Sequence, residues 1–168
     1  MQKIIFLDFD GVLNSGDNSR AISLLLFNDP EKVNTSIAGF EFDERCVRWL
    51  THIINSTGAK IVVSSSWRLN YTLDEMRAIW KHFNLPGELI GYTPFIDNEF
   101  TEIFDGAEIK PAERGKEIER WLGENKVDKY CIIDDDFDML PTQVFVQTDP
   151  KFGLTYDTSK LIIEYLTE

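Results

Sequence analysis

Two carboxylates that stand one residue apart, directly after an apolar run, constrain this chain more than any other feature. The run at residues 4–7 is apolar throughout, which indicates a strand buried on both faces, as in parallel sheets. Because side chains on a strand alternate with period two, Asp8 and Asp10 point to the same side, and Gly11 lets the backbone turn beside them. A pair of solvated acids at a turn is the competing interpretation. Two acids at the end of a buried strand cost free energy unless they bind a cation or take part in chemistry, so we expect a functional site here.

Strands and helices alternate along the rest of the chain. The expected strands are residues 3–7, 60–64, 89–92, 130–133 and 144–146. The expected helices are residues 43–57, 72–83, 113–123 and 158–166. Such alternation is typical of an α/β fold in which helices cover both faces of a parallel sheet. Ligands bind such sheets at the carboxyl ends of the strands.

The composition is that of one globular domain, residues 1–168, which is long enough to bury a substantial core. No run approaches the ~20 apolar residues that a membrane span needs. The first strand begins at residue 3, which leaves no room for a signal peptide. We therefore expect a soluble, cytoplasmic protein that does not bind membranes. Cys46 and Cys131 lie within apolar patterns and are expected to be buried free thiols.

The net charge of −12 limits the partners that the chain can bind. Extensive nucleic-acid binding needs clustered Lys and Arg side chains that neutralise phosphates, and the sequence has no run of them. We therefore expect no long nucleic-acid groove. A small local basic site remains compatible with this charge, and a bound divalent cation would offset part of it.

Polar residues also follow two of the other expected strands. The strand at 60–64 runs into a serine cluster, and the strand at 130–133 runs into three acids. Serines there are typical of a turn, whereas three adjacent carboxylates repel one another unless a cation is close. A basic segment stands where the helix at 113–123 begins, although each of its charges taken singly is typical of solvated surface. The residues concerned are Ser64, Ser65, Ser66, Asp134, Asp135, Asp136, Lys110, Arg114 and Lys116.

Taken in order, these segments resemble the four motifs of the haloacid dehalogenase-like (HAD) superfamily of phosphotransferases. Motif I is a hydrophobic strand followed by Asp-x-Asp-Gly, here residues 8–11. Motif II is a strand that ends in Ser or Thr. We prefer Ser65 for it, because the related form places Thr two residues before Trp; Ser64 and Ser66 remain alternatives.

The two later motifs also leave alternatives open. Motif III is a cation near the start of a helix. We prefer Arg114 for it, because it directly precedes Gly115; Lys110 and Lys116 are the alternatives. Motif IV, acids after a strand, matches Asp134 and Asp135, and either can be the main metal ligand.

The resemblance covers nearly the whole chain. Segments 114–122, 134–141 and 146–155 are similar to the small HAD-domain branch whose members include modules of "Swiss Army knife" RNA-repair proteins. This implies a three-layer Rossmann-like HAD fold with a mainly parallel sheet. Superfamily members select substrates through cap insertions after motif I or between motifs II and III. Here residues 15–42 suffice only for a small lid, and residues 93–110 for a loop or small hairpin, so we expect a minimal cap and an open site.

The resemblance also implies Mg²⁺-dependent hydrolysis of phosphomonoesters through an aspartyl-phosphate. Asp8 would be the nucleophile and Asp10 the general acid and base. Mg²⁺ prefers oxygen ligands, and Asp8, the backbone carbonyl of Asp10, and Asp134 or Asp135 would supply them. Ser65 and Arg114 would hold the phosphoryl oxygens.

The substrate follows less directly from the resemblance. An open site is compatible with a phosphorylated small molecule such as a nucleotide, with a nucleic-acid end, or with a phosphoprotein. The side chains expected nearest the substrate phosphate are Ser64, Ser66, Arg68 and Lys116. Side chains that could contact a base or phosphate are Arg20, Trp67, Tyr71, Tyr92 and Phe95. The alternative function is a catalytically silent HAD-like binding module, which would be expected to lose one acid of motif I; here both remain.

Overall fold

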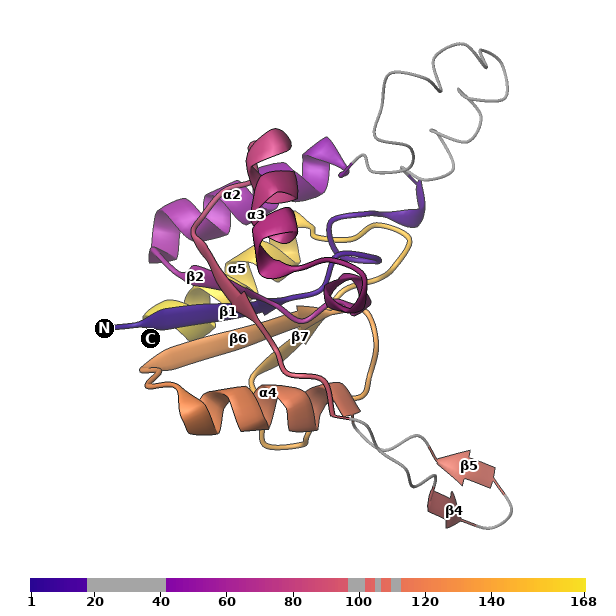
Figure 1. The fold of residues 1–168 in the computed structure, drawn as a ribbon. Helices are drawn as coiled ribbons and strands as arrows, with labels where there is room; N and C mark the ends of the chain where they lie inside the picture. Colours follow the sequence, from indigo (N-terminus) through magenta and orange to yellow (C-terminus); the bar gives the residue numbers. More distant parts are fainter. Residues whose placement is uncertain (18–41, 97–101, 105–106, 110–112) are drawn as a thin grey trace, which may run out of the picture.

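A five-stranded parallel sheet forms the centre of the molecule (Figure 1). The computed structural model describes residues 1–17, 42–96, 102–104, 107–109 and 113–168. Along the sheet the strands follow the order β3-β2-β1-β6-β7, and each neighbouring pair is parallel. Their bounds are β3 Leu89–Tyr92, β2 Lys60–Val63, β1 Lys3–Leu7, β6 Lys129–Asp134 and β7 Phe145–Gln147. The predicted α/β fold with a mainly parallel sheet is confirmed.

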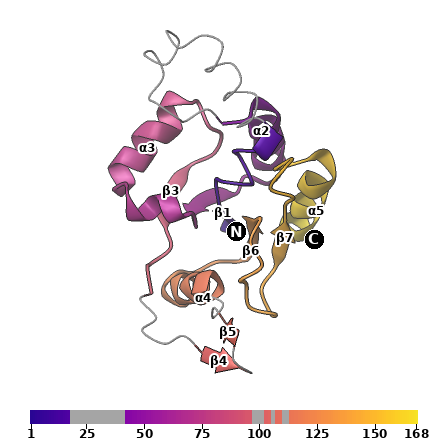
Figure 2. The ribbon, with the colours of Figure 1, turned by 90° about the vertical axis from the view of Figure 1, so that its right-hand side faces the viewer.

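Helices cover both faces of this sheet, which gives three layers (Figures 1 and 2). Among the described residues the α-helices are α2 Glu44–Thr57, α3 Leu73–His82, α4 Glu113–Glu124 and α5 Tyr156–Thr167. Helices α2, α3 and α5 lie on one face and α4 lies on the other. The short 3₁₀ helix η2, Ser66–Leu69, directly follows β2.

The alternation of side chains on β1 explains why both faces need helices. Ile5 and Leu7 belong to the core beneath α2, α3 and α5, whereas Ile4 and Phe6 belong to the core beneath α4. All four side chains are fully buried, so the strand is apolar at every position. Full burial of one such side chain stabilises the fold by about 1.5–3 kcal/mol.

The helix ends follow the local signals in the sequence. Asp43 caps α2 by accepting a hydrogen bond from the Arg45 backbone N–H, and Gly58 ends this helix in the left-handed conformation at φ 65°. Thr72 and Glu75 form the predicted capping box at the start of α3. These contacts confirm the helix boundaries that the sequence predicts to within about two residues.

The two segments outside the regular pattern are described only in part. Strands β4 Glu102–Phe104 and β5 Ala107–Ile109 pair antiparallel, as expected for a small hairpin in the 93–110 insertion. Residues 18–41, which make up most of the expected lid, lie outside the described residues. The division into one domain with a lid stays a prediction. Cys46 and Cys131 are free and buried, as expected. No helix in the described ranges is long and apolar enough to cross a membrane.

Candidate functional site

The carboxyl ends of three adjacent strands bring the predicted motifs together. Strand β1 pairs with β2 and with β6, and Leu7 is level with Val63 on one side and Ile133 on the other. The Asp8 backbone N–H donates to the Ile133 carbonyl at 3.0 Å, and the Ser64 N–H donates to the Leu7 carbonyl at 2.8 Å. Motifs I, II and IV therefore meet at one edge of the sheet, although 126 residues separate Asp8 from Asp134 in the sequence.

Three of the predicted acids form a compact cluster at this edge. Carboxylate oxygens of Asp8, Asp134 and Asp135 lie within 4.8 Å of one another. Asp8 is 6% exposed and Asp134 is fully buried. Gly11 makes room for the third acid, because a Cβ atom at this glycine would lie 2.3 Å from Asp135 Cγ, and its φ of +72° is unfavourable for other residues.

Arg114 reaches this cluster from the first turn of α4. Its Nη1 atom lies 3.2 Å from Asp8 Oδ1 and 3.3 Å from Asp134 Oδ2, and it also donates to the Ser64 carbonyl oxygen. Gly115 lets this end of α4 approach the loop after β6, because a Cβ atom there would lie 2.6 Å from the Leu140 backbone nitrogen. The cation that the sequence places in motif III is therefore in contact with acids of motifs I and IV.

Burial makes the negative charges of this cluster costly. It raises the pKa of Asp8 to about 6, an effect that the Arg114 guanidinium partly offsets. It also raises the pKa of Asp134 to about 8, with a further contribution from the charge of Asp8. The pKa of Asp135 is raised by burial and by its neighbour Asp136. One arginine thus faces three crowded carboxylates.

The cluster fits a divalent cation. Oxygen ligands from several carboxylates are what Mg²⁺ prefers in proteins. Asp134 Oδ2 is buried and accepts no hydrogen bond, although Arg114 lies within ion-pair distance. An ion at this position would neutralise the charge that Arg114 leaves uncompensated. Asp8, Asp134 and Asp135 are the side chains that could hold it.

The second acid of motif I stands apart from the cluster. The Asp10 carboxylate is exposed, and each of its oxygens accepts one hydrogen bond. Trp67 Nε1 donates to Oδ2 at 2.9 Å and Asn14 Nδ2 donates to Oδ1 at 3.1 Å. The expected metal contact through the Asp10 backbone carbonyl stays a prediction.

The three serines of motif II occupy different surroundings. Ser65 is buried, its hydroxyl partly offsets the raised pKa of Asp8, and it caps η2 by accepting from the Trp67 N–H at 3.4 Å. Ser64 is also buried, and its Oγ has no hydrogen-bond partner. Ser66 is exposed in η2. Of the three, the preferred residue Ser65 is the one whose hydroxyl affects the pKa of the expected nucleophile.

The remaining predicted cations lie in contrasting places. Arg68 forms an ion pair with Glu117 of α4, in which the two side chains are only 6% and 4% exposed. Arg68 also donates to the Ser65 carbonyl at 2.7 Å. Lys116 is exposed on α4, and Lys110 lies outside the described residues. A direct contact of Arg68 or Lys116 with substrate stays a prediction.

Sequence reasoning missed three contacts of this site: those of Trp67 and Asn14 with Asp10, and that of Glu117 with Arg68. It assigned no role to Glu117. A signal for Glu117 was present, because a charged residue directly precedes the buried Ile118 on the apolar face of α4 and stands three residues after Arg114. No comparable signal marks the indole of Trp67.

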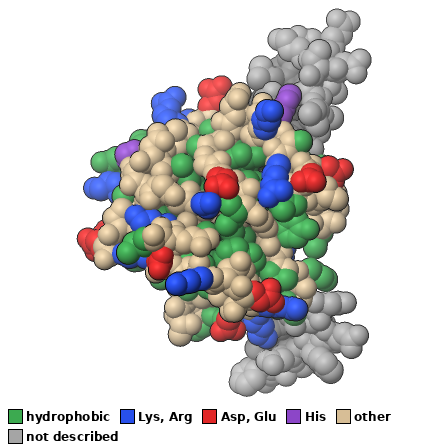
Figure 3. All heavy atoms as spheres, turned by 60° about the vertical axis from the view of Figure 1, so that its left-hand side comes forward, with side chains coloured by type: hydrophobic (Ala, Val, Ile, Leu, Met, Phe, Trp, Pro, Cys, Tyr) green, Lys and Arg blue, Asp and Glu red, His purple; other side chains and the backbone are tan. Residues whose placement is uncertain are grey.

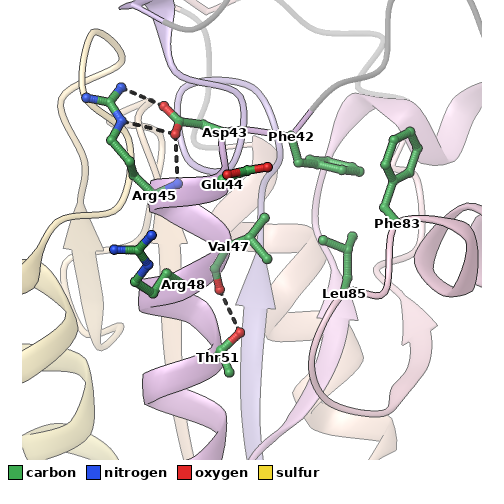
Figure 4. Close-up of a pocket in the computed structure, with 9 residues that line it drawn as sticks. All are labelled: Phe42, Asp43, Glu44, Arg45, Val47, Arg48, Thr51, Phe83 and Leu85. Atoms are coloured by element: carbon green, nitrogen blue, oxygen red, sulfur yellow. Dashed lines mark hydrogen bonds and ion pairs between the residues drawn. The ribbon is translucent and has the colours of Figure 1, made fainter. Parts of the chain in front are cut away.

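A pocket with a volume of about 800 Å³ lies elsewhere, at the N-terminal end of α2. Figure 4 shows Phe42, Phe83 and Leu85 on one side of this helix and the guanidinium groups of Arg45 and Arg48 on the other. Arg45 is paired with Asp43. None of the predicted site residues lines this pocket, so its size alone does not make it the functional site.

Comparison with known proteins agrees with this geometry. A family model described as the HAD domain in Swiss Army Knife RNA repair proteins matches residues 4–158. No curated protein and no solved structure matches the chain. The match extends from the first residues of β1 into α5 and contains every acid, serine and arginine of the cluster. The chain therefore belongs to the family of HAD domains found in Swiss Army Knife RNA repair proteins.

Proposed function

We propose that the protein is a Mg²⁺-dependent phosphomonoester hydrolase that works through an aspartyl-phosphate on Asp8. The observation that carries this proposal is the contact of Arg114 with both Asp8 and Asp134 inside a cluster of three carboxylates. A purely structural ion pair would need one acid for one arginine. Three acids at a strand end leave negative charge that a divalent cation and a phosphoryl group can share.

Four residues at this edge of the sheet have distinct tasks in this mechanism. A carboxylate oxygen of Asp8 attacks phosphorus while the ester oxygen leaves. Asp10 gives a proton to that leaving oxygen and later takes one from the water that hydrolyses the aspartyl-phosphate. Ser65 and Arg114 hold the phosphoryl oxygens in line for both steps. A bound Mg²⁺ would supply charge stabilisation to the transferring group.

The family points to nucleotides or nucleic-acid ends as the substrate class. Its description names RNA repair proteins, and a terminal phosphate of a nucleic acid is a phosphomonoester of the kind that this site would hydrolyse. Recognition would then be confined to the phosphate and its nearest neighbours, with Ser64, Ser66, Arg68 and Lys116 as the expected contacts. A silent binding module is the second candidate, and the retention of both motif I acids argues against it.

Phosphate release from a generic aryl phosphate, with and without Mg²⁺, tests the proposal. We expect turnover that requires Mg²⁺ and a loss of more than about a hundredfold in Asp8→Asn, because an amide is a poor nucleophile of the same shape. Asp157→Asn, at an exposed acid in the first turn of α5, is the matched control and should retain full activity. Circular dichroism of both variants checks that they fold. Activity of Asp8→Asn within about tenfold of the parent would exclude Asp8 as the nucleophile.

A further inference from the structure

The indole of Trp67 is one of two groups that hold the Asp10 carboxyl in place. Asp10 is exposed, so rotation of its side chain would otherwise be unhindered by packing. Trp67 Nε1 and Asn14 Nδ2 each donate to a different carboxylate oxygen, at 2.9 and 3.1 Å. Donors on both oxygens fix the plane of the carboxyl group, because rotation would break both hydrogen bonds.

Aromatic packing fixes the indole in turn. The Trp67 ring meets Phe9 edge to face, with centroids 5.1 Å apart and an interplanar angle of 90°. Its ring centroid also lies 5.9 Å from that of Phe42 and 6.2 Å from that of Tyr71. Phe9 stands between the two acids of motif I and is fully buried. The indole is therefore packed against the same strand end that carries Asp8 and Asp10.

The short helix that carries Trp67 is anchored at both of its ends. Ser65 caps η2 through its hydroxyl, and Arg68 joins the same helix to Glu117 of α4 through a buried ion pair. Two residues of this segment thus act on the two acids of motif I: the Ser65 hydroxyl partly offsets the raised pKa of Asp8, and the Trp67 indole donates a hydrogen bond to Asp10.

We propose that Trp67 is a positioning residue for the acid–base step: its indole N–H orients the Asp10 carboxyl toward the leaving oxygen of the substrate. This inference rests on the proposed hydrolase function. In the first step the bond from Asp8 oxygen to phosphorus forms, the ester P–O bond breaks, and the Asp10 proton goes to the departing oxygen. In the second step the Asp10 carboxylate takes a proton from water, and that water oxygen displaces the Asp8 oxygen to release phosphate.

Substrates with different leaving groups distinguish the loss of a positioned acid from general damage to the site. An aryl phosphate with an acidic phenol departs with little need of a proton, whereas an alkyl phosphate needs one. The ratio kcat/KM reports the steps up to formation of the aspartyl-phosphate, so later hydrolysis does not mask the effect. Trp67→Phe keeps an aromatic ring but removes the N–H donor together with the second ring of the indole, so a control must account for the lost packing.

We expect Trp67→Phe to lower kcat/KM for an alkyl phosphate by about tenfold or more, a fraction of the full effect of a general acid. The same variant should lower kcat/KM for p-nitrophenyl phosphate by less than about threefold. Trp80→Phe is the matched control, because Trp80 packs against the same Phe9 at 6.2 Å but donates its indole N–H to the Gly87 carbonyl. It should affect both esters equally. Equal losses for both esters in Trp67→Phe would overturn the positioning role.

A second measurement does not depend on activity. The chain has four tryptophans, so its indole N–H signals can be assigned in a nitrogen-15 correlation spectrum by substituting each in turn. Asp10→Asn should move the Trp67 signal and leave the Trp80 signal in place; a stationary Trp67 signal would overturn the contact. A parent enzyme without phosphatase activity on either ester would overturn the proposed function, and the positioning role with it, even where the spectrum shows the contact.

Discussion

At the scale of single residues, burial of the acidic cluster makes the stability of the fold depend on pH. Burial raises the pKa of Asp8 and of Asp134 above the usual carboxyl range of about 4. A folded state with raised acid pKa values binds more protons than the unfolded state. The contribution of these two acids to the free energy of unfolding is therefore present at low pH, and it is lost as pH rises through the folded-state pKa values. With a chelator present to remove metal ions, we expect the free energy of unfolding to fall between about pH 5 and pH 8 because of these two acids.

Asp134→Asn should remove much of that pH dependence. It replaces a buried charge by a neutral group of the same shape. With chelator present at pH 8, the variant should therefore melt at least about 2–4 °C higher than the parent, which corresponds to ~1 kcal/mol. The measurement is thermal unfolding at several pH values. Asp149→Asn, at an exposed acid, serves as the control. A variant that melts below the parent at pH 8, or that keeps the parent's pH slope, would show that Asp134 is not destabilised by its burial.

At the scale of elements, the ion pair of Arg68 and Glu117 joins η2 to α4. Glu117 also accepts a hydrogen bond from the Ile96 N–H at 3.3 Å, so the same carboxylate contacts the chain beyond β3. Removing one partner of a buried pair leaves the other charge uncompensated, which typically costs about 3–5 kcal/mol. We expect losses of this order in Arg68→Met and in Glu117→Gln.

The double variant Arg68→Met/Glu117→Gln should lose less than the sum of the two single losses, by about 0.5–3 kcal/mol. Urea unfolding measures all three. The exposed pair of Arg120 and Glu124 on the same helix is the control, and Arg120→Met should cost less than about 1 kcal/mol. If Arg68→Met costs no more than Arg120→Met, the pair does not hold the two elements together.

The elements also show what the sequence could and could not predict. Strand β1 and the caps of α2 and α3 depend on neighbouring residues, so periodicity and capping signals predicted them. The cluster followed from motifs at strand ends, because parallel strands end at one edge of a sheet. The contacts of Trp67 with Asp10 and of Arg68 with Glu117 join residues 57 and 49 positions apart. They depend on how η2 lies between β1 and α4, and no local pattern encodes that placement.

At the scale of the whole molecule, charge limits how the substrate can be recognised. The net charge is −12, and the sequence has no run of Lys and Arg. Figure 3 shows the side of the molecule from which the strands begin, away from the cluster, and there Lys and Arg side chains are interspersed with Asp and Glu. The cation in contact with the cluster, Arg114, is already shared between two carboxylates. A negative net charge and one shared arginine at the cluster suit recognition of one terminal phosphate and disfavour tracking of a long phosphate backbone.

Substrate length and salt test this limit together. Each phosphate that a protein neutralises adds to the slope of affinity against salt, so contacts with one or two phosphates should lower kcat/KM by less than about tenfold between 50 and 200 mM salt. We therefore expect phosphate release from mono-, di- and decanucleotides to show similar kcat/KM values and similarly shallow salt slopes. The control is the aryl phosphate, which has one phosphate and no neighbouring nucleotide and therefore gives the salt slope of the terminal phosphate alone. A decanucleotide that reacts far faster than the mononucleotide, with a loss of about 10³ or more over the same salt range, would require a basic groove and contradict recognition of the terminal phosphate alone.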